Sequence, residues 1–204
     1  MTDNRKRKSF FLKIIKHIPG NSFRIFLLKK MFGYSIGKNV KIGKLIINCN
    51  KVTIGDNVYI ASNNIIQCNQ LSVGSHTSIH SGNVIQGGAN FCIGTNSRII
   101  NNHYFDVHHD IEIGNNTWIA GKNSQFWTHG SIHTKSKTKN LGIKIKDNIY
   151  VGSASCFAPG VYIESENLIG LGSVVTKNFI QNKTIIAGNP AVVVKEDIDW
   201  RANW

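Results

Sequence analysis

Eight histidines carry most of the reactive chemistry in this chain of 204 residues. An imidazole can accept a proton from a hydroxyl near neutral pH, and in its neutral form it can bind zinc. Five of them lie in the middle of the chain: His76, His80, His103, His108 and His109. His129 stands apart, after Phe126-Trp127-Thr128 and directly before a polar segment with several lysines, Gly130 to Leu141. Proton transfer and metal binding are therefore the two chemistries that these residues offer.

The cysteines suggest less chemistry, because they lie far apart and form no CxxC pair: Cys49, Cys68, Cys92 and Cys156. We expect them to be small buried side chains rather than a disulfide framework. We find no secretion signal, and no segment reaches the roughly 20 apolar residues of a transmembrane helix. The sequence thus predicts a reducing, cytoplasmic location.

The elements that must position these side chains follow a period of six. An unbroken series at this spacing consists of Ile145, Val151, Phe157, Ile163, Ile169 and Val175. Shorter units of the same kind begin at Ile54, Val73, Ile93 and Ile113, each followed by glycine. A hexapeptide period fits neither a helix nor simple strand alternation, and it is typical of a parallel β-helix. We expect the aliphatic side chains to stack inward from coil to coil, with glycine at corners where a Cβ would be strained.

The net charge of +13 is concentrated at the N-terminus. Up to Lys44 the chain has twelve basic residues and one acid, Asp3. Such a bias predicts an anionic neighbour, such as a lipid surface, an acidic glycan or a phosphate-bearing carrier. No nucleic-acid recognition motif accompanies the charge, so nucleic acid is not an expected partner.

Three regions follow along the chain. Residues 1–34 are expected to form a basic, amphipathic helical cap, interrupted at Pro19-Gly20, which either covers the open end of the solenoid or lies on a membrane surface. Residues 35–178 form the predicted all-β domain, with a projecting loop at 130–142. Residues 179–204 are expected to run as extended chain and then as a short helix from Ala191 to Trp204.

Four strings occur in order in the C-terminal third: Ile149-Tyr150-Val151-Gly152-Ser153, Ala158-Pro159-Gly160-Val161, Ile169-Gly170-Leu171-Gly172-Ser173-Val174-Val175-Thr176-Lys177 and Ala187-Gly188-Asn189-Pro190-Ala191. With them the chain resembles the hexapeptide-repeat acetyltransferases over about residues 36–195, especially sugar O-acetyltransferases related to galactoside, maltose and nodulation-factor enzymes. Its basic N-terminus is similar to that of enzymes that acetylate capsule, O-antigen or other cell-surface glycans. The resemblance implies a left-handed parallel β-helix, a homotrimer with active sites between protomers, acetyl-CoA as donor and no metal.

The resemblance also implies a catalytic residue. His129, 21 residues before Tyr150, matches the family's catalytic histidine by position, although Gly130 replaces the usual proline. Its implied role is that of a general base in direct acetyl transfer to a sugar hydroxyl, of a cell-surface polysaccharide or its precursor. Such a base contributes roughly 10²–10⁴-fold in rate. His133 is the second choice.

Further roles are implied at matching positions. The backbone N–H of Ser153 would stabilise the oxyanion, and Asp106 or Asp110 would orient the base. An amide at Asn102 could bond sugar hydroxyls as donor and acceptor. The full set implied for the acceptor is Asn102, His103 and Trp127. The set implied for coenzyme A is Tyr150, Ser153, Leu171, Thr176, Lys177 and Lys195, of which Tyr150 and Leu171 replace a tryptophan and an alanine.

Three other functions remain open. An N-acetyltransferase acting on an amino sugar would use the same base and donor groove. A zinc enzyme similar to the γ-class carbonic anhydrases would use the histidines around His103 and His108. A non-catalytic solenoid that binds glycan or membrane through its basic cap would need no base.

Overall fold

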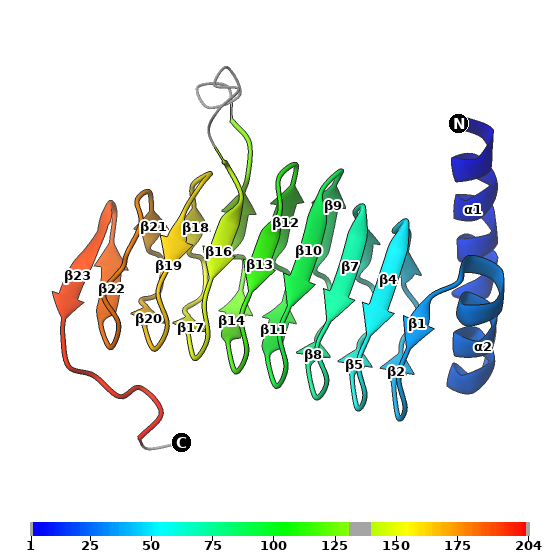
Figure 1. Cartoon of the computed structure of the whole chain (residues 1–204), viewed down its shortest axis with the longest axis horizontal. Helices are drawn as coiled ribbons and strands as arrows, with labels where there is room; N and C mark the ends of the chain where they lie inside the picture. The colour runs from blue at the N-terminus through cyan, green and yellow to red at the C-terminus, as the bar shows by residue number, and fades with distance from the viewer. Residues whose placement is uncertain (1, 131–139, 203–204) are drawn as a thin grey trace.

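The computed structural model describes residues 2–130 and 140–202, which form a left-handed parallel β-helix with a pair of helices at one end (Figure 1). Sheet A contains β1 (Ser35–Ile36), β4 (Lys51–Ile54), β7 (Gln70–Val73), β10 (Asn90–Ile93), β13 (Ile111–Ile113), β16 (Ile143–Ile145) and β19 (Tyr162–Ile163). Sheet B contains β2 (Lys41–Ile42), β5 (Tyr59–Ile60), β8 (Ser78–Ile79), β11 (Arg98–Asn101), β14 (Trp118–Lys122), β17 (Tyr150–Val151), β20 (Leu168–Ile169), β22 (Ile185–Gly188) and β23 (Ala191–Lys195). Sheet C contains β3 (Ile46–Ile47), β6 (Ile65–Gln67), β9 (Val84–Gly87), β12 (Tyr104–Val107), β15 (Gln125–Trp127), β18 (Cys156–Phe157) and β21 (Val174–Val175).

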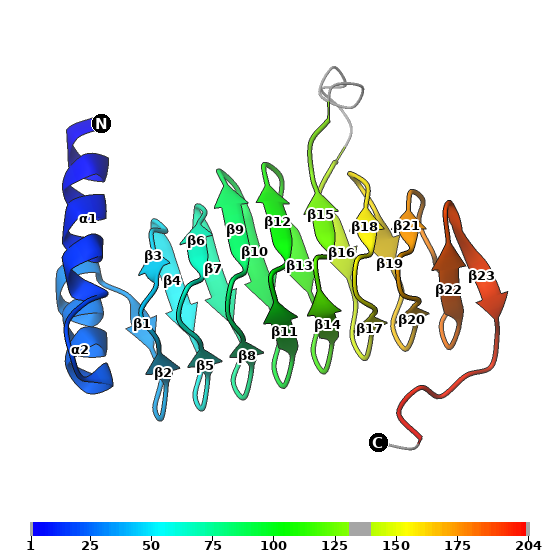
Figure 2. The ribbon, with the colours of Figure 1, turned by 180° about the vertical axis from the view of Figure 1, so that it is seen from behind.

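The chain visits the sheets in the order A, B, C, so each coil has three corners, called here the AB, BC and CA corners. Sheet C is seen from the front in Figure 2, with its strands ending at the CA corner. Neighbouring coils pair in parallel at equivalent repeat positions, for example Phe105 with Phe126 and Phe126 with Phe157. The predicted fold class, a parallel β-helix, is therefore confirmed.

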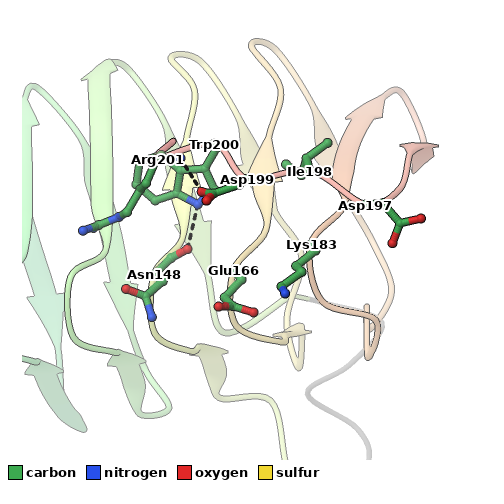
Figure 3. Close-up of a pocket in the computed structure, with 8 residues that line it drawn as sticks. All are labelled: Asn148, Glu166, Lys183, Asp197, Ile198, Asp199, Trp200 and Arg201. Carbon is green, nitrogen blue, oxygen red and sulfur yellow. Dashed lines mark hydrogen bonds between the residues drawn. The ribbon is translucent and has the colours of Figure 1, made fainter. Parts of the chain in front are cut away.

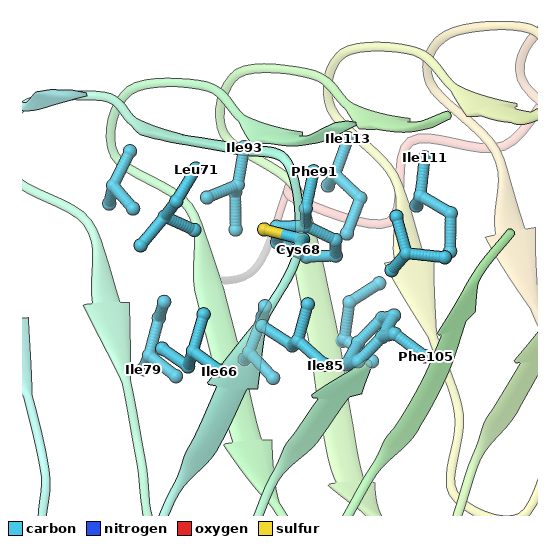
Figure 4. Close-up of a cluster of buried hydrophobic side chains, with 14 of the residues drawn as sticks. Ile66, Cys68, Leu71, Ile79, Ile85, Phe91, Ile93, Phe105, Ile111 and Ile113 are labelled. Carbon is cyan, nitrogen blue, oxygen red and sulfur yellow. The ribbon is translucent and has the colours of Figure 1, made fainter. Parts of the chain in front are cut away.

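The core is a set of inward stacks, one side chain per coil (Figure 4). Phe105, Phe126 and Phe157 are fully buried, and their rings stack at centroid distances of 4.5 Å for both neighbouring pairs. Cys49 and Cys68 are buried as predicted, whereas Cys92 and Cys156 are only partly buried. Because each inward side chain contacts its equivalent above and below, the strands β12, β15 and β18 are held in a fixed register.

The corners differ from the prediction in one respect. Left-handed backbone at the AB corners is adopted mainly by asparagine, with φ between 52° and 57° at Asn57, Asn96, Asn116 and Asn148. The repeat glycines are required for close approach instead: a Cβ on Gly94 would come within 2.7 Å of the Gly114 carbonyl carbon on the next coil. Asparagine tolerates this conformation and also pairs between coils, since Asn96 Nδ2 donates to Asn116 Oδ1 at 2.8 Å.

Two helices, α1 (Thr2–Ile15) and α2 (Asn21–Phe32), cover the first coils, as predicted for the N-terminal cap. Leu12, Ile15 and Leu28 are buried against the end of the solenoid. Lys8 Nζ donates to the Cys49 carbonyl at 2.6 Å, which ties α1 to the corner after β3. Within the described residues, neither helix has the length and apolar content that crossing a bilayer requires.

The predicted C-terminal helix is not found among the described residues. Ala191–Lys195 is strand β23, which pairs antiparallel with β22. Three successive valines, Val192 to Val194, explain the difference, because β-branched side chains favour strands over helices. The chain after β23 runs back along the AB corners, where Trp200 Nε1 donates to the Asn148 carbonyl at 2.8 Å (Figure 3).

Candidate active site

His129 lies at a CA corner, two residues after the end of β15. Its Nδ1 is 2.6 Å from Oδ2 of Asp106, which lies on β12 one coil earlier. The parallel register of β12 and β15, with Asp106 opposite Trp127, places this carboxylate beside the histidine. A carboxylate that accepts a hydrogen bond from one ring nitrogen fixes the tautomer and leaves the other nitrogen as a base.

Asp106 is almost fully buried, with 3% of its side chain exposed. Its Oδ2 also accepts the Thr128 N–H at 3.1 Å, and its Oδ1 is 2.9 Å from Nδ1 of His108. Burial acts to raise the pKa of this carboxyl, but the hydrogen bonds from His129, His108 and Thr128 outweigh burial and lower the pKa below its ordinary value. Asp106 is therefore ionised at neutral pH and balances the charge of a protonated imidazole.

Of the two orienting candidates that the sequence offered, the structure brings only Asp106 into contact with His129. Asp110 lies at the same corner, but its Oδ1 accepts the Asn90 N–H at 2.9 Å. His108 is a neighbour of His129 that sequence reasoning missed: the two rings lie tilted against each other, with centroids 3.9 Å apart. The contacts of Asp106 and His108 with His129 depend on which corner residues of neighbouring coils lie side by side. The hexad period alone does not predict these neighbours.

A cation could also suit this corner, since Asp106, His108 and His129 each offer a ligand atom within 4.8 Å of the others. Both Nδ1 atoms already face the carboxylate, so a metal there would have to replace two N–H···O bonds. The zinc cluster around His103 and His108 is not assembled within the chain, because His103 lies at a BC corner, on the opposite edge of sheet C. Its side chain points into the solenoid.

The donor-site residues fall mainly at BC corners and on sheet B. Ser153 follows β17, and the N–H groups on either side of it, of Gly152 and Ala154, donate to backbone carbonyls at 2.8 Å. In the described part of the chain no hydrogen bond uses the N–H of Ser153 itself. Leu171, on the next coil, is 75% exposed beside it. This corner therefore offers one backbone donor next to an exposed apolar surface, as an acyl group would require.

The remaining donor positions are divided between two edges. Tyr150 lies on β17, with its ring centroid 5.6 Å from that of Trp200, and Lys195 lies on β23. Thr176 and Lys177 follow β21 and are exposed at the CA corner, the edge that carries His129. Within one chain the residue predicted as the base, His129, and the residue predicted as the oxyanion donor, Ser153, therefore lie on opposite edges of sheet C.

The acceptor residues are likewise separated. Asn102 lies at a BC corner in left-handed conformation, with φ of 58°. Trp127 is partly exposed on sheet C, where its ring lies 5.1 Å from that of Tyr104. The prediction that His103 contacts the acceptor is wrong: this side chain is 1% exposed, and its Nδ1 accepts the Ser124 N–H at 3.1 Å inside the solenoid. His133, the second choice for the base, lies outside the described residues.

A further cavity lies away from His129. It measures about 540 Å³ and lies between the C-terminal chain and the AB corners (Figure 3). Its lining consists of Asn148, Glu166, Lys183, Asp197, Ile198, Asp199, Trp200 and Arg201. No residue predicted for acetyl transfer lines it.

A parallel solenoid with hexapeptide periodicity and a carboxylate-bound histidine at one corner defines the class: a hexapeptide-repeat β-helix with the elements of a proton-transfer enzyme. Over 206 aligned residues the chain is 24% identical to galactoside O-acetyltransferase of Escherichia coli (strain K12), which covers 96% of this chain and 89% of that protein. No protein-family model matches the sequence. The motifs predicted an acyltransferase of the hexapeptide-repeat type, and the similarity to galactoside O-acetyltransferase over nearly the whole chain supports that prediction.

Solved structures share the fold. The polysialic acid O-acetyltransferase OatWY superposes with a TM-score of 0.57 at 20% identity, covering 81% of this chain and 83% of that one. A hexapeptide-repeat-containing acetyltransferase from Vibrio cholerae superposes with a TM-score of 0.50 at 19% identity, covering 95% of this chain and 91% of that one.

Proposed function

We propose that this protein is an acetyl-CoA-dependent O-acetyltransferase that modifies a sugar hydroxyl of a cell-surface polysaccharide or its precursor. The observation that carries this proposal is the contact between His129 and the buried, ionised carboxylate of Asp106. The similarity to galactoside O-acetyltransferase over nearly the whole chain supports the class of acceptor. A positioned imidazole of this kind suits removal of a proton from an attacking hydroxyl.

The transfer is direct and needs no acyl-enzyme. Acetyl-CoA, when bound, supplies the acetyl group as a thioester. Nε2 of His129 accepts the proton of the sugar hydroxyl as its oxygen attacks, and Asp106 balances the charge on the imidazolium. The N–H of Ser153 donates to the acyl oxygen as negative charge develops there. His129 then returns its proton to the departing sulfur, which leaves an acetylated sugar and free coenzyme A.

One chain cannot supply both the base and the oxyanion donor. The BC and CA corners are separated by a sheet C strand, and from residue 124 to residue 128 this is roughly 13 Å at the rise of an extended chain. A base must lie within about 3 Å of the proton that it removes. The active site therefore combines the CA corner of one protomer, carrying His129, with the BC corner of another, carrying Ser153. Three such pairings close a homotrimer with cyclic symmetry.

In this arrangement the donor lies along the BC corner. Leu171 and Tyr150 provide apolar surface for the pantetheine arm, and Lys195 lies nearby on β23 for a phosphate. Thr176 and Lys177 contact the same donor from the neighbouring protomer. The acceptor contacts Trp127, whose exposed ring can pack against a sugar, and the amide of Asn102.

The helical cap adds a contact with an anionic membrane on the cytoplasmic side. Five large apolar side chains on α1 and α2 are 43–61% exposed: Phe10, Ile14, Phe23, Phe26 and Met31. The other side of α2 is already packed on the solenoid through Leu28. Lys13, Lys29 and Lys30 on the same two helices are also exposed, and basic residues outnumber acids nine to one in residues 1–34. Aromatic side chains next to lysines suit the interface of an anionic bilayer.

The direct test is thiol release from acetyl-CoA in the presence of a panel of cell-surface oligosaccharides and their lipid-linked precursors. Mass spectrometry of the products should show the gain of one acetyl group on a sugar oxygen. Acetylation confined to amino sugars would replace the proposal by N-acetyl transfer. Absence of turnover with every acceptor, by a folded trimer, would overturn the proposed function.

A further inference from the structure

The carboxylate of Asp106 is hydrogen-bonded to two imidazoles, those of His129 and His108. Oδ2 is 2.6 Å from Nδ1 of His129, and Oδ1 is 2.9 Å from Nδ1 of His108. The two rings lie in a tilted arrangement, with centroids 3.9 Å apart and planes inclined by 38°. A general base needs only one carboxylate partner, so the proton transfer described above does not require the second ring.

The chemistry of the carboxylate sets the tautomer of both rings. An ionised carboxylate only accepts hydrogen bonds, so each Nδ1 carries a proton toward it. In a neutral imidazole the remaining nitrogen is then an acceptor. Nδ1 and Nε2 lie on different sides of the ring, so each Nε2 is directed away from the buried Asp106. Their side chains are 37% exposed at His129 and 58% exposed at His108.

The corner therefore presents two hydrogen-bond acceptors side by side. Among the described residues no hydrogen bond to Nε2 of either His108 or His129 is found. His108 and His109 also line a cavity of about 350 Å³, together with Asn140 and Lys144. A ligand bound at His129 can therefore extend past His108 into this cavity. Such a ligand must offer two O–H donors close together.

Neighbouring hydroxyls of a sugar meet this requirement. We propose that the acceptor is a vicinal diol and that His108 determines this specificity. Nε2 of His129 takes the proton of the reacting hydroxyl, while Nε2 of His108 accepts a hydrogen bond from the adjacent hydroxyl. This inference rests on the proposed function, because it assumes a sugar hydroxyl as nucleophile. Since His108 is more than half exposed, water competes with the second bond, and its loss should reduce kcat/KM by about tenfold.

The test compares acceptors that differ by one hydroxyl. Methyl galactoside and the methyl glycoside of N-acetylneuraminic acid serve as probes, each with the set of its monodeoxy derivatives. The wild-type enzyme should lose turnover when the reacting hydroxyl is missing, and about tenfold in kcat/KM when its neighbour is missing. Removal of a distant hydroxyl should have little effect.

The variant His108→Phe supplies the matched comparison, because it keeps an aromatic ring beside His129 but has no ring nitrogen. Its penalty for the missing neighbouring hydroxyl should disappear, so that this variant turns over the diol and the corresponding deoxy acceptor at similar rates. His108→Gln, which keeps an acceptor oxygen, should restore part of the preference. This readout separates a contact with the acceptor from a structural role, which would lower turnover of all acceptors alike.

Three results would overturn the inference. A wild-type enzyme that acetylates diol and deoxy acceptors equally well has no second contact. If His108→Phe still prefers diol over deoxy acceptors, another residue determines this specificity. Stoichiometric zinc in the purified trimer, with activity lost on chelation, would make Asp106, His108 and His129 a metal site. If the enzyme turns over diol and deoxy acceptors equally well, only the inference of a vicinal diol is rejected. If it turns over no acceptor, the proposed function is rejected as well.

Discussion

Nδ1 of His129 and Oδ2 of Asp106 lie 2.6 Å apart, between two coils of the solenoid whose strands β12 and β15 pair at Tyr104, Phe105 and Asp106. This contact orients the imidazole of His129 and leaves its Nε2 as the nitrogen that can accept a proton. The two residues can be tested by separate substitutions, one at the partly exposed His129 and one at the buried Asp106.

The variant His129→Ala should lower kcat by about 10²–10⁴-fold, the usual contribution of a general base. Asp106→Asn should lower kcat by about tenfold or more, because it removes the negative charge that stabilises the imidazolium. Asp110→Asn is the control at the same corner, and its kcat should stay close to wild type. Steady-state thiol release measures all three, and an unchanged kcat in His129→Ala removes His129 from the mechanism.

Gly121 tests the position of the oxyanion donor. Its φ is +64°, and a Cβ there would overlap the hydroxyl of Ser153. Gly172 has a similar φ of +69° but nothing within 4 Å of a Cβ. Gly172→Ala should therefore cost only the backbone strain, about 1 kcal/mol in the free energy of unfolding. Gly121→Ala should lose more stability and also lower kcat, because it displaces Ser153.

Chemical denaturation and thiol release give the two readouts for this pair. Equal losses of stability in the two variants, with kcat unchanged in both, would show that Ser153 tolerates displacement. That result would argue against its N–H as the oxyanion donor.

His103 should make the fold sensitive to acid. Burial lowers the pKa of its imidazole to about 4, and the nearby Gly121 carbonyl offsets only part of this effect. The unfolded chain binds a proton at His103 below about pH 6.5, and the folded chain does not until about pH 4. The free energy of unfolding should therefore fall as pH drops through this window, by on the order of 3 kcal/mol from this residue.

His103→Gln has no titrating group and should flatten the pH dependence between pH 6.5 and 4, even if its stability at neutral pH is lower. His17→Gln, at an exposed position on the surface, is the control and should retain the wild-type slope. Denaturant titrations at several pH values measure how the free energy of unfolding of each variant depends on pH. An identical slope in His103→Gln would show that His103 does not sense pH in the folded state.

The cap should bind anionic membranes through its exposed aromatic side chains. Replacing Phe10, Phe23 and Phe26 together by serine should remove most co-sedimentation with vesicles of phosphatidylcholine and phosphatidylglycerol. Vesicles of phosphatidylcholine alone should bind little of either protein, since the lysines then have no partner. Ile180→Ser, which alters an even more exposed apolar residue far from the cap, should bind like wild type.

Unchanged binding of the triple variant would contradict the membrane contact. A triple variant that no longer forms the native oligomer would place these side chains between protomers instead. Analytical ultracentrifugation of the same samples distinguishes the two results.

The period of six predicted the solenoid, because each inward side chain repeats the same contact on every coil, as Phe105, Phe126 and Phe157 do. The cap followed from the break at Pro19-Gly20. Strand β23 did not follow, since a short segment after the last repeat has no period from which to predict it. The Asp106–His129 contact was only one of two candidates, because corner residues meet across coils at distances that vary with each turn. His103 was misplaced because it shares a BC corner with Asn102: Asn102 is exposed and His103 is buried, and the hexad period does not show which corner side chains point inward.

The central claim, that each active site combines two edges of neighbouring protomers, has a direct test in mixed trimers. One parent is His129→Ala, which lacks the base. The other is Leu171→Glu, which places a negative charge at an exposed position on the donor edge and should exclude the anionic coenzyme. Each parent alone should be nearly inactive, while both should fold, because neither altered residue belongs to the core.

Refolding the two parents together in equal amounts should restore thiol release to about a quarter of the wild-type rate, because every mixed trimer then contains one intact pair of edges. A mixture that stays at the parental rate, although mixed trimers are present, would contradict the account and place the base and the donor in a single chain.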